Sequence, residues 1–382
     1  MSPRFLSILT AFLPQAASIV GFSGLASAAE LPSWALGPFS RPENAQPVIR
    51  PDAASKFDCP VRKQSVPWEA RHTFNPAATV MNGRICMLYR AEDNSGNGSI
   101  GSYTSRLGLA VSDHGVSFTR LPEPVFFPAQ DNQWFFEWSG GCEDPRLATG
   151  PDGTHVLTYT QYPGRNPSRN FRGGFRIGLA TSKDLRTWTK HGSPFTGTPF
   201  ELTGIKSAGI LQKVENGTLV AAKVNGKYWM YFGERAVYLA SSDDLIRWVP
   251  LENEKGGFKE IMTTRKGRFD SLLTEVGPPP VLTEKGIVLI YNGKNGDPNK
   301  NGDPALANGV YTCGQALFDK ADPSKLVTRL DEPFFKPELD WEKSGQYVAG
   351  TTFAEGLVRF KGRWFLYYGC ADTFVGVAAS KD

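Results

Sequence analysis

Short apolar runs separated by polar, turn-forming residues follow one another along most of the chain. One such run, Leu107–Asp113, ends in a Ser-Asp turn, and similar stretches recur at 177–184, 237–244 and 375–382. A degenerate copy lies at 311–319. Ser and Asp suit this turn because their side chains bond nearby backbone N–H groups. Five copies, spaced roughly 60 to 75 residues apart, indicate five repeats of one structural unit.

Two more strand-like runs precede each copy. The nearer runs are 85–89, 156–159, 229–232, 287–291 and 364–368. The farther runs are 76–80, 145–148, 208–212, 278–282 and 356–360. Turn dipeptides such as Asn82-Gly83 join the two runs as hairpins, and a fourth segment follows around Phe118, Trp188 or Trp248. Each unit is therefore predicted to contain four antiparallel strands.

Five repeated four-stranded units are typical of an all-β fold, the five-bladed β-propeller. We predict that residues 61–382 form this single domain. Two stacked β-sandwiches are the alternative, but they would not repeat one motif five times. Residues 30–60 are rich in Pro and Ala and are predicted to be an extended lead-in.

The first 29 residues differ from the rest of the chain. Arg4 is the only charged residue before Glu30, the run Phe5–Leu13 is mostly apolar, and small residues fill 26–29. This order is typical of a secretory signal peptide over residues 1–29 and predicts an exported protein, periplasmic or extracellular. A buried N-terminal helix is the alternative. No later stretch is long and apolar enough to be expected to span a membrane.

Composition narrows the possible partners. The 42 basic and 38 acidic residues are spread along the chain, so no basic stripe for nucleic acid is expected. The five cysteines show no C-x-x-C pair, and we expect no zinc site, other metal or cofactor. An odd number of cysteines leaves at least one free thiol, and Cys86 is expected in the core. The pairing of the others and the oligomeric state stay open.

In a propeller, polar residues that begin a unit's first strand or end its second strand meet at one end of the central axis. The first-strand positions are Asn75, Glu143-Asp144, Lys206-Ser207, Glu275 and Glu355. The second-strand positions are Arg90 to Asp93, Gln161, Glu234, Asn292 and Asp372. Carboxylates and amides bind sugar hydroxyls, and paired carboxylates cleave acetals. A purely structural interpretation also stands: Asp144-Pro145-Arg146 could be a turn in which Arg146 bridges units, and Glu275 could cap a loop.

At these positions the chain resembles glycoside hydrolase family 130, which comprises β-mannoside phosphorylases and β-1,2-mannosidases on five-bladed propellers. The similar elements span about 300 residues in the family's order: 74–77, 89–93, 141–146, 277–280 and 367–372. The resemblance implies that Asp144 is the general acid, with its proton passing through a hydroxyl of the bound mannose. It also implies that Asn75, Arg90 and Asp372 hold that mannose.

Departures from the phosphorylase pattern indicate hydrolysis. The phosphorylases usually carry His where this chain has Asn292, and a basic residue near Gly233 or Glu234. Lys206 remains, but Glu234 and Glu275 resemble the carboxylates of the hydrolytic branch. Two anions repel phosphate and can instead hold and deprotonate a water. Sequence leaves open which of the two is the base.

The expected protein is therefore an inverting glycosidase that releases mannose from β-1,2-linked mannosides, with Asp144, Glu234 and Glu275 as catalytic residues. Asp144 is expected to have a raised pKa so that it stays protonated. Further substrate-binding residues are predicted at Glu92, Asp93, Arg146, Lys206 and Asn292. Alternatives are a phosphorylase that forms mannose 1-phosphate, a carbohydrate-binding propeller without catalysis, and an arabinanase-like enzyme. Linkage, chain length and aglycone stay open.

Overall fold

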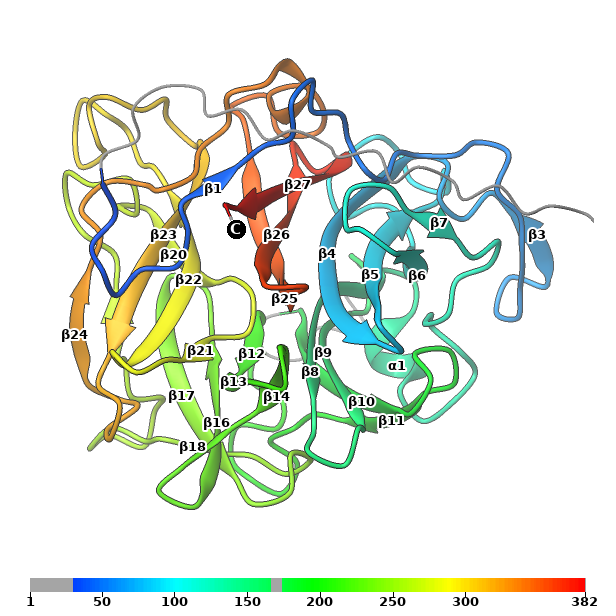
Figure 1. Cartoon of the computed structure of the whole chain (residues 1–382). Helices are drawn as coiled ribbons and strands as arrows, with labels where there is room; N and C mark the ends of the chain where they lie inside the picture. The colour runs from blue at the N-terminus through cyan, green and yellow to red at the C-terminus, as the bar shows by residue number, and fades with distance from the viewer. Residues whose placement is uncertain (1–29, 166–173, 382) are drawn as a thin grey trace, which may run out of the picture.

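The computed structural model describes residues 30–165 and 174–381, and these are almost entirely strand and loop (Figure 1). The prediction of an all-β chain is confirmed. The described helices are short: α1 (Trp134–Glu137) and the 3-10 helix η2 (Asp340–Glu342). Within the described ranges, no helix has the length and apolar character needed to cross a membrane. The predicted signal peptide, residues 1–29, lies outside these ranges and stays a prediction.

Each predicted repeat corresponds to one antiparallel unit of strands. Unit one contains β4 (His72–Met81), β5 (Arg84–Glu92), β6 (Ser105–Ser112) and β7 (Thr119–Arg120). Unit two contains β8 (Gly141–Thr149), β9 (His155–Tyr162), β10 (Arg176–Ser182) and β11 (Thr189–Gly192). Unit three contains β12 (Ala208–Ile210), β16 (Lys227–Phe232), β17 (Ala236–Ser242) and β18 (Val249–Pro250), with β15 (Lys223–Val224) and β19 (Met262–Thr263) at its margins.

The last two units recruit strands from elsewhere in the chain. Unit four contains β20 (Leu273–Val276), β21 (Val281–Leu282), β22 (Ile287–Lys294), β23 (Tyr311–Phe318) and β24 (Leu326–Arg329). The hairpin of β13 (Gln212–Glu215) and β14 (Thr218–Ala221) joins it through a parallel pairing with β21. Unit five contains β25 (Thr352–Phe360), β26 (Arg363–Cys370), β27 (Phe374–Ser380) and β1 (Phe39–Ser40). A separate hairpin joins β2 (Phe57–Cys59) to β3 (Gln64–Val66).

The recurring Ser-x-Asp turn closes its units through one set of hydrogen bonds. In unit two, the Ser182 hydroxyl accepts the backbone N–H of Leu185, and the Asp184 carboxylate accepts the N–H groups of residues 186 and 187. Ser242 and Asp244 repeat this arrangement in unit three. The prediction that Ser and Asp side chains stabilise these turns is confirmed. Their local hydrogen bonds explain why the motif is visible in the sequence.

Neighbouring units pack face to face through separate apolar clusters. Leu88 of unit one packs with Leu147 of unit two, and Tyr231 of unit three with Leu289 of unit four. The clusters between units two and three and between units four and five follow the same plan. Residues of unit five pack against unit one in the same way. All five cysteines are buried free thiols, and Cys86 belongs to the cluster between units one and two. The first and last units are therefore neighbours.

Part of the predicted lead-in belongs to the sheets. Phe39 pairs with Ser380, so β1 forms the outer strand of unit five beside the C-terminal strand (Figure 1). Arg41 then reaches η2, where its guanidinium binds the fully buried Glu342 carboxylate at 2.7 and 2.9 Å. No sequence pattern indicated this attachment, because a two-residue strand carries almost no periodicity.

We expect Arg41→Ala to lower the free energy of unfolding by about 3–5 kcal/mol, because it leaves the buried Glu342 carboxylate without its cation. Thermal or urea unfolding measures the loss. Arg84→Ala is the matched control: its pair with Asp113 is exposed, with side-chain exposures of 46% and 72%, and about 1 kcal/mol or less is expected. Equal losses in the two variants would contradict a stabilising role for the Arg41 contact.

Candidate active site

The first strands of units one and two are interrupted by β-bulges. The register shifts between Phe74 and Pro76 in β4, and between Glu143 and Arg146 in β8. The residues inside the bulges, Asn75 and Asp144, have φ angles of 47° and 46°. Asn and Asp tolerate this left-handed conformation better than most residues. A bulge re-aims the side chain it carries, and these two side chains meet: the Asn75 amide donates to Asp144 Oδ1 at 2.8 Å.

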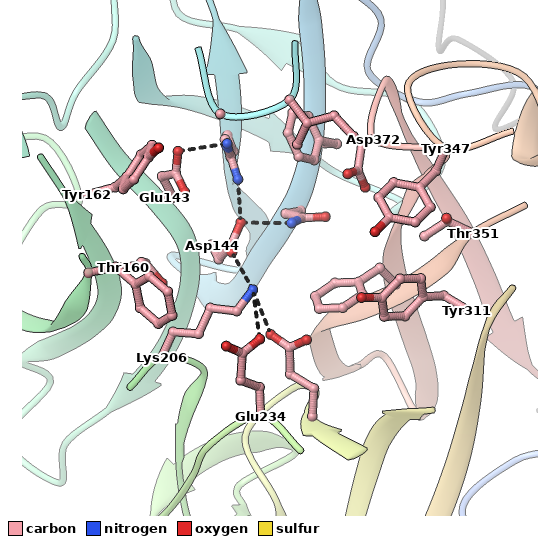
Figure 2. Close-up of a pocket in the computed structure, with 18 residues that line it drawn as sticks. Glu143, Asp144, Thr160, Tyr162, Lys206, Glu234, Tyr311, Tyr347, Thr351 and Asp372 are labelled. Carbon is pink, nitrogen blue, oxygen red and sulfur yellow. Dashed lines mark hydrogen bonds and ion pairs between the residues drawn. The ribbon is translucent and has the colours of Figure 1, made fainter. Parts of the chain in front are cut away.

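A pocket of about 290 Å³ lies at this meeting point (Figure 2). Its volume is near the lower end of the range for small-molecule sites, roughly 300–1,000 Å³. Figure 2 shows Thr160 and Tyr162 on one side, Tyr311 and Tyr347 on the other, and Lys206 between Asp144 and Glu234. The lining residues are Phe74, Asn75, Arg90, Ile100, Gly101, Glu143, Asp144, Thr160, Tyr162, Phe175, Lys206, Glu234, Glu275, Tyr311, Tyr347, Thr351, Phe353 and Asp372.

Arg90 holds three carboxylates in one wall of the pocket. Its Nη1 lies 2.9 Å from Asp144, and its Nη2 lies 2.7 Å from both Glu92 and Glu143. Its Nε donates to the Ser105 hydroxyl at 3.0 Å. A guanidinium has five N–H groups, so at most one, on Nη1, is left for a ligand. Arg90 therefore fixes the positions of three acidic groups.

Lys206 joins the opposite sides of the pocket. Its ammonium lies 3.2 Å from Glu275, 3.7 Å from Glu234 and 3.8 Å from Asp144. Glu234 and Glu275 come from units three and four, and their backbones pair in an antiparallel bridge. Glu275 also accepts a short hydrogen bond from the Ser207 hydroxyl. One cation therefore separates the predicted acid from the two predicted water-binding carboxylates.

The acidic groups differ in proton affinity. Burial raises the pKa of Asp144, but Arg90, Lys206 and Arg146, together with the Asn75 hydrogen bond, outweigh burial and hold it below its usual range. This is opposite to the raised value that the sequence led us to expect. Burial raises the pKa of Glu143 to about 7, and burial likewise raises that of Asp372 to about 7. The pKa values of Glu143 and Asp372 therefore lie above that of Asp144.

Several buried polar atoms of the pocket have no hydrogen-bond partner within the described ranges. They are Asn75 Oδ1, Thr160 Oγ1 and Thr351 Oγ1. Buried polar groups are normally hydrogen-bonded, so a ligand with several hydroxyl groups would satisfy them. Tyr and Phe rings beside them offer apolar contact area. This combination suits a sugar.

Seven of the eleven residues predicted from sequence line this pocket: Asn75, Arg90, Asp144, Lys206, Glu234, Glu275 and Asp372. The other four, Glu92, Asp93, Arg146 and Asn292, lie outside its lining. Glu92 lies behind Arg90 and is 1% exposed. Direct substrate contact by these four residues stays a prediction, because the structure places them outside the lining.

Side-chain direction and contacts explain why Asp93, Asn292 and Arg146 lie outside the lining. Successive side chains of a strand point to opposite faces, so Asp93 turns away from the pocket and pairs with the buried Arg106 at 2.8 Å. Asn292 is fully buried, and its amide bonds both the N–H and the C=O of Ala354. Arg146 donates to the carbonyls of residues 276 and 277 and contacts Glu355. Arg146 bridges units two, four and five, as the structural interpretation proposed.

Sequence reasoning missed several lining residues. Gln161 was predicted at the end of a second strand, but it points into a buried network with Arg176. Its neighbours Thr160 and Tyr162 therefore face the pocket, an outcome that strand alternation could have indicated. Tyr347 and Thr351 lie in an irregular loop, where no periodic signal exists. Within the described ranges, no three His, Cys, Asp or Glu side chains form a group that could hold a metal ion.

Known proteins are similar to this chain over most of its length. A family model of glycoside hydrolase family 130, described as beta-1,4-mannooligosaccharide phosphorylase, matches residues 39–382. A 1,2-beta-oligomannan phosphorylase of Thermoanaerobacter sp. (strain X514) is 33% identical, over 87% of this chain and 94% of its own length. A beta-1,2-mannobiose phosphorylase of the same organism is 30% identical, over 81% of this chain and 90% of its own.

Solved structures are similar over nearly the whole chain. One comes from a study stating that this family of mannoside phosphorylases contains glycoside hydrolases that target beta-1,2 mannosidic linkages in Candida mannan. It is 50% identical, covers 92% of this chain and 96% of its own, and has a TM-score of 0.88. A glycosyl hydrolase from Bacteroides ovatus is 53% identical, covers 92% and 95%, and has a TM-score of 0.87. Because the family model spans most of the sequence, the chain belongs to glycoside hydrolase family 130.

Proposed function

We propose that this enzyme acts on β-mannosides as an inverting hydrolase, releasing mannose from β-1,2-linked manno-oligosaccharides. The observation that carries the proposal is the position of Lys206, enclosed by Asp144, Glu234 and Glu275. The 50%-identical structure from the study of β-1,2-linkage hydrolases supports the same branch.

The charge of the pocket opposes phosphate binding. Its lining contains two cations, Arg90 and Lys206, against five carboxyl groups. Arg90 has already committed most of its N–H groups, and Lys206 lies among three carboxylates. A phosphate at 4 Å from a single carboxylate is repelled by about 4 kcal/mol at an effective dielectric constant of 20. A water molecule meets no such penalty, and carboxylates can hold it.

The spacing of the carboxylates is compatible with inversion. Asp144 and Glu234 lie on opposite sides of the Lys206 ammonium in Figure 2. Their oxygens are at most about 7.5 Å apart, the sum of their distances to the shared nitrogen. Inverting glycosidases separate their two carboxyl groups by about 6.5–9.5 Å and retaining ones by about 5–5.5 Å.

Glu234 is the better candidate for the base. Its side chain is 26% exposed, and its cation lies 3.7 Å away. Burial raises its pKa. Glu275 is 1% exposed and is held by both Ser207 and Lys206. The more exposed carboxylate is suited to remove a proton from water, and the fixed one to position it.

Asp144 must carry a proton when the glycosidic bond breaks. In the free site its neighbours hold it ionised. A neutral sugar that fills the pocket removes the remaining water, and this additional burial raises the pKa of a carboxyl group. We infer that substrate binding raises the pKa of Asp144 so that this residue can carry the proton of the general acid. This is consistent with proton transfer through a mannose hydroxyl.

Hydrolysis is tested by its independence from phosphate. We expect mannose to be released from β-1,2-mannobiose in phosphate-free buffer, with less than about a twofold rate change when phosphate is added, because the lining carboxylates repel that anion. Product analysis by NMR should show α-mannose first, since the water attacks from the opposite face. Phosphate-dependent formation of mannose 1-phosphate would instead favour the phosphorylase, the activity for which the 33%-identical relative is named.

The fold and destination of the chain are proposed alongside its activity. We propose that the five units form a five-bladed β-propeller over residues 61–382. The contact of unit five with unit one and the pairing of β1 with β27 support this fold. We also propose that residues 1–29 direct export of the protein and are then removed.

A further inference from the structure

Glu143 lies in the pocket wall but has no role in the proposed hydrolysis by Asp144, Glu234 and Glu275. Its side chain is 11% exposed, against 1% for Glu92. The two carboxylates meet at the same nitrogen: Glu92 Oε1 and Glu143 Oε1 each lie 2.7 Å from Arg90 Nη2. The Ser105 hydroxyl also lies 3.0 Å from Glu143 Oε1 and 3.5 Å from Glu92 Oε1.

The charges of this cluster do not balance if every group is ionised. Arg90 supplies one positive charge, while Glu92, Glu143 and Asp144 would supply three negative ones. Carboxylates that share a buried site do not all ionise together, and one of them keeps a proton. Asp144 has Asn75 and Lys206 as additional partners. The proton therefore belongs to one of the two glutamates.

The contacts of Glu143 determine where its proton would lie. Oε1 accepts from Arg90 and from Ser105, so the hydroxyl of a protonated Glu143 would be formed at Oε2. No described residue is hydrogen-bonded to Oε2, and Glu143 lines the pocket. A protonated carboxyl group is a hydrogen-bond donor, which a carboxylate is not.

We propose that Glu143 binds substrate in its protonated form, donating a hydrogen bond from Oε2 to a sugar hydroxyl. This inference rests on the proposed function for its ligand class. Loss of the proton would place an additional anion against the acceptor oxygen, so binding fails on the alkaline side. Burial raises the pKa of Glu143 to about 7, so we expect substrate binding to weaken above this pH.

Other titratable groups face this carboxyl from each neighbouring element. Arg90 and Glu92 approach from β5, and Asp144 follows in β8. Tyr162 in β9 stays neutral, because burial raises its pKa. Asp372, after β26, interacts with Arg90 and titrates in the same range as Glu143. Asp372 is unchanged in the Glu143 variants. An inflection of the pH–rate profile that disappears in these variants therefore belongs to Glu143.

The test compares kcat/KM on β-1,2-mannobiose at pH 6 and pH 9 within each variant. For the parent we expect a fall of roughly a hundredfold, because a group with a pKa near 7 is about 1% protonated at pH 9. In Glu143→Gln, whose amide donates at every pH, the fall should be much smaller than in the parent, and any remaining part belongs to Asp372. Glu143→Ala, with no donor, should be roughly tenfold to a hundredfold below Glu143→Gln at pH 6.

Glu92→Gln is the matched control, because it removes a carboxylate from the same Arg90 nitrogen outside the pocket lining. We expect the hundredfold fall to persist in this variant. A fall that disappears in Glu92→Gln, or persists at its full size in Glu143→Gln, overturns the proposal. A roughly thousandfold loss at every pH in Glu143→Gln also overturns it, since Glu143 would then work as an anion or an acid.

Two readouts do not depend on turnover. The infrared C=O band of a protonated carboxyl group should be present in the parent at pH 6 and weaker in Glu143→Gln. The Kd for mannose, measured by calorimetry, should rise with pH more steeply in the parent than in that variant. If the parent hydrolyses no β-mannoside, the proposed function fails, while these two measurements still decide whether Glu143 carries a proton that binding requires.

Discussion

Replacing Asp144 by Asn is expected to lower kcat on β-1,2-mannobiose by roughly 10²–10⁴-fold, the usual contribution of a general acid. Asn has the same shape and tolerates the φ of 46° at this bulge, so the fold should persist. The amide cannot supply the proton that the leaving sugar requires. Steady-state rates and circular dichroism of the same preparations measure the two effects.

An activated substrate separates the acid role of Asp144 from a binding role. A nitrophenyl β-mannoside has a leaving group that needs no proton, so its hydrolysis should be much less affected by Asp144→Asn. Equal losses on both substrates would contradict the acid assignment. They would indicate that Asp144 mainly positions the sugar together with Asn75 and Arg90.

The second large effect is expected on the opposite side of Lys206. Glu234→Gln should lose roughly 10²–10⁴-fold in kcat, because a neutral amide cannot deprotonate the attacking water. Glu275→Gln should lose activity as well, through a misplaced water and a disturbed Lys206. Rates of mannose release from β-1,2-mannobiose measure both losses.

Azide distinguishes the base from the positioning carboxylate. It is a nucleophile that needs no deprotonation, so it should restore turnover of an activated mannoside in Glu234→Gln and yield the α-mannosyl azide. Glu275→Gln should not be rescued to the same extent. Rescue confined to Glu275→Gln would exchange the two roles, and rescue of neither variant would exclude this water-activating pair.

Local pattern was sufficient to predict the strands and their order. The Ser-x-Asp turns form hydrogen bonds within a few residues, as Ser182 and Asp184 show, so the sequence alone contains their signal. The same is not true of β1, whose two residues gain their partner from the far end of the chain. Sequence reasoning assigned that segment only to an extended lead-in.

The site was predicted only in part, because its residues are close in space but distant in the sequence. Counting strand ends brought Lys206, Glu234 and Glu275 to one pocket, and the structure places all three in its lining. The position of a strand end does not reveal which face of the sheet a side chain lies on. A shift of one residue along the strand moves the side chain to the opposite face. Asp93 and Asn292 were misplaced on this account, and Thr160 and Tyr162 were overlooked.

The sequence by itself determined the repeated β-unit, the acidic character of the pocket and the identity of its principal carboxylates. Only the tertiary structure decided the order of their pKa values. Asp144 was expected to have a raised pKa, yet cations from units one and three lower it. Burial raises the pKa of Glu143 to about 7. Turns and strands depend on neighbours in the chain, whereas a proton affinity depends on charges brought together from distant units.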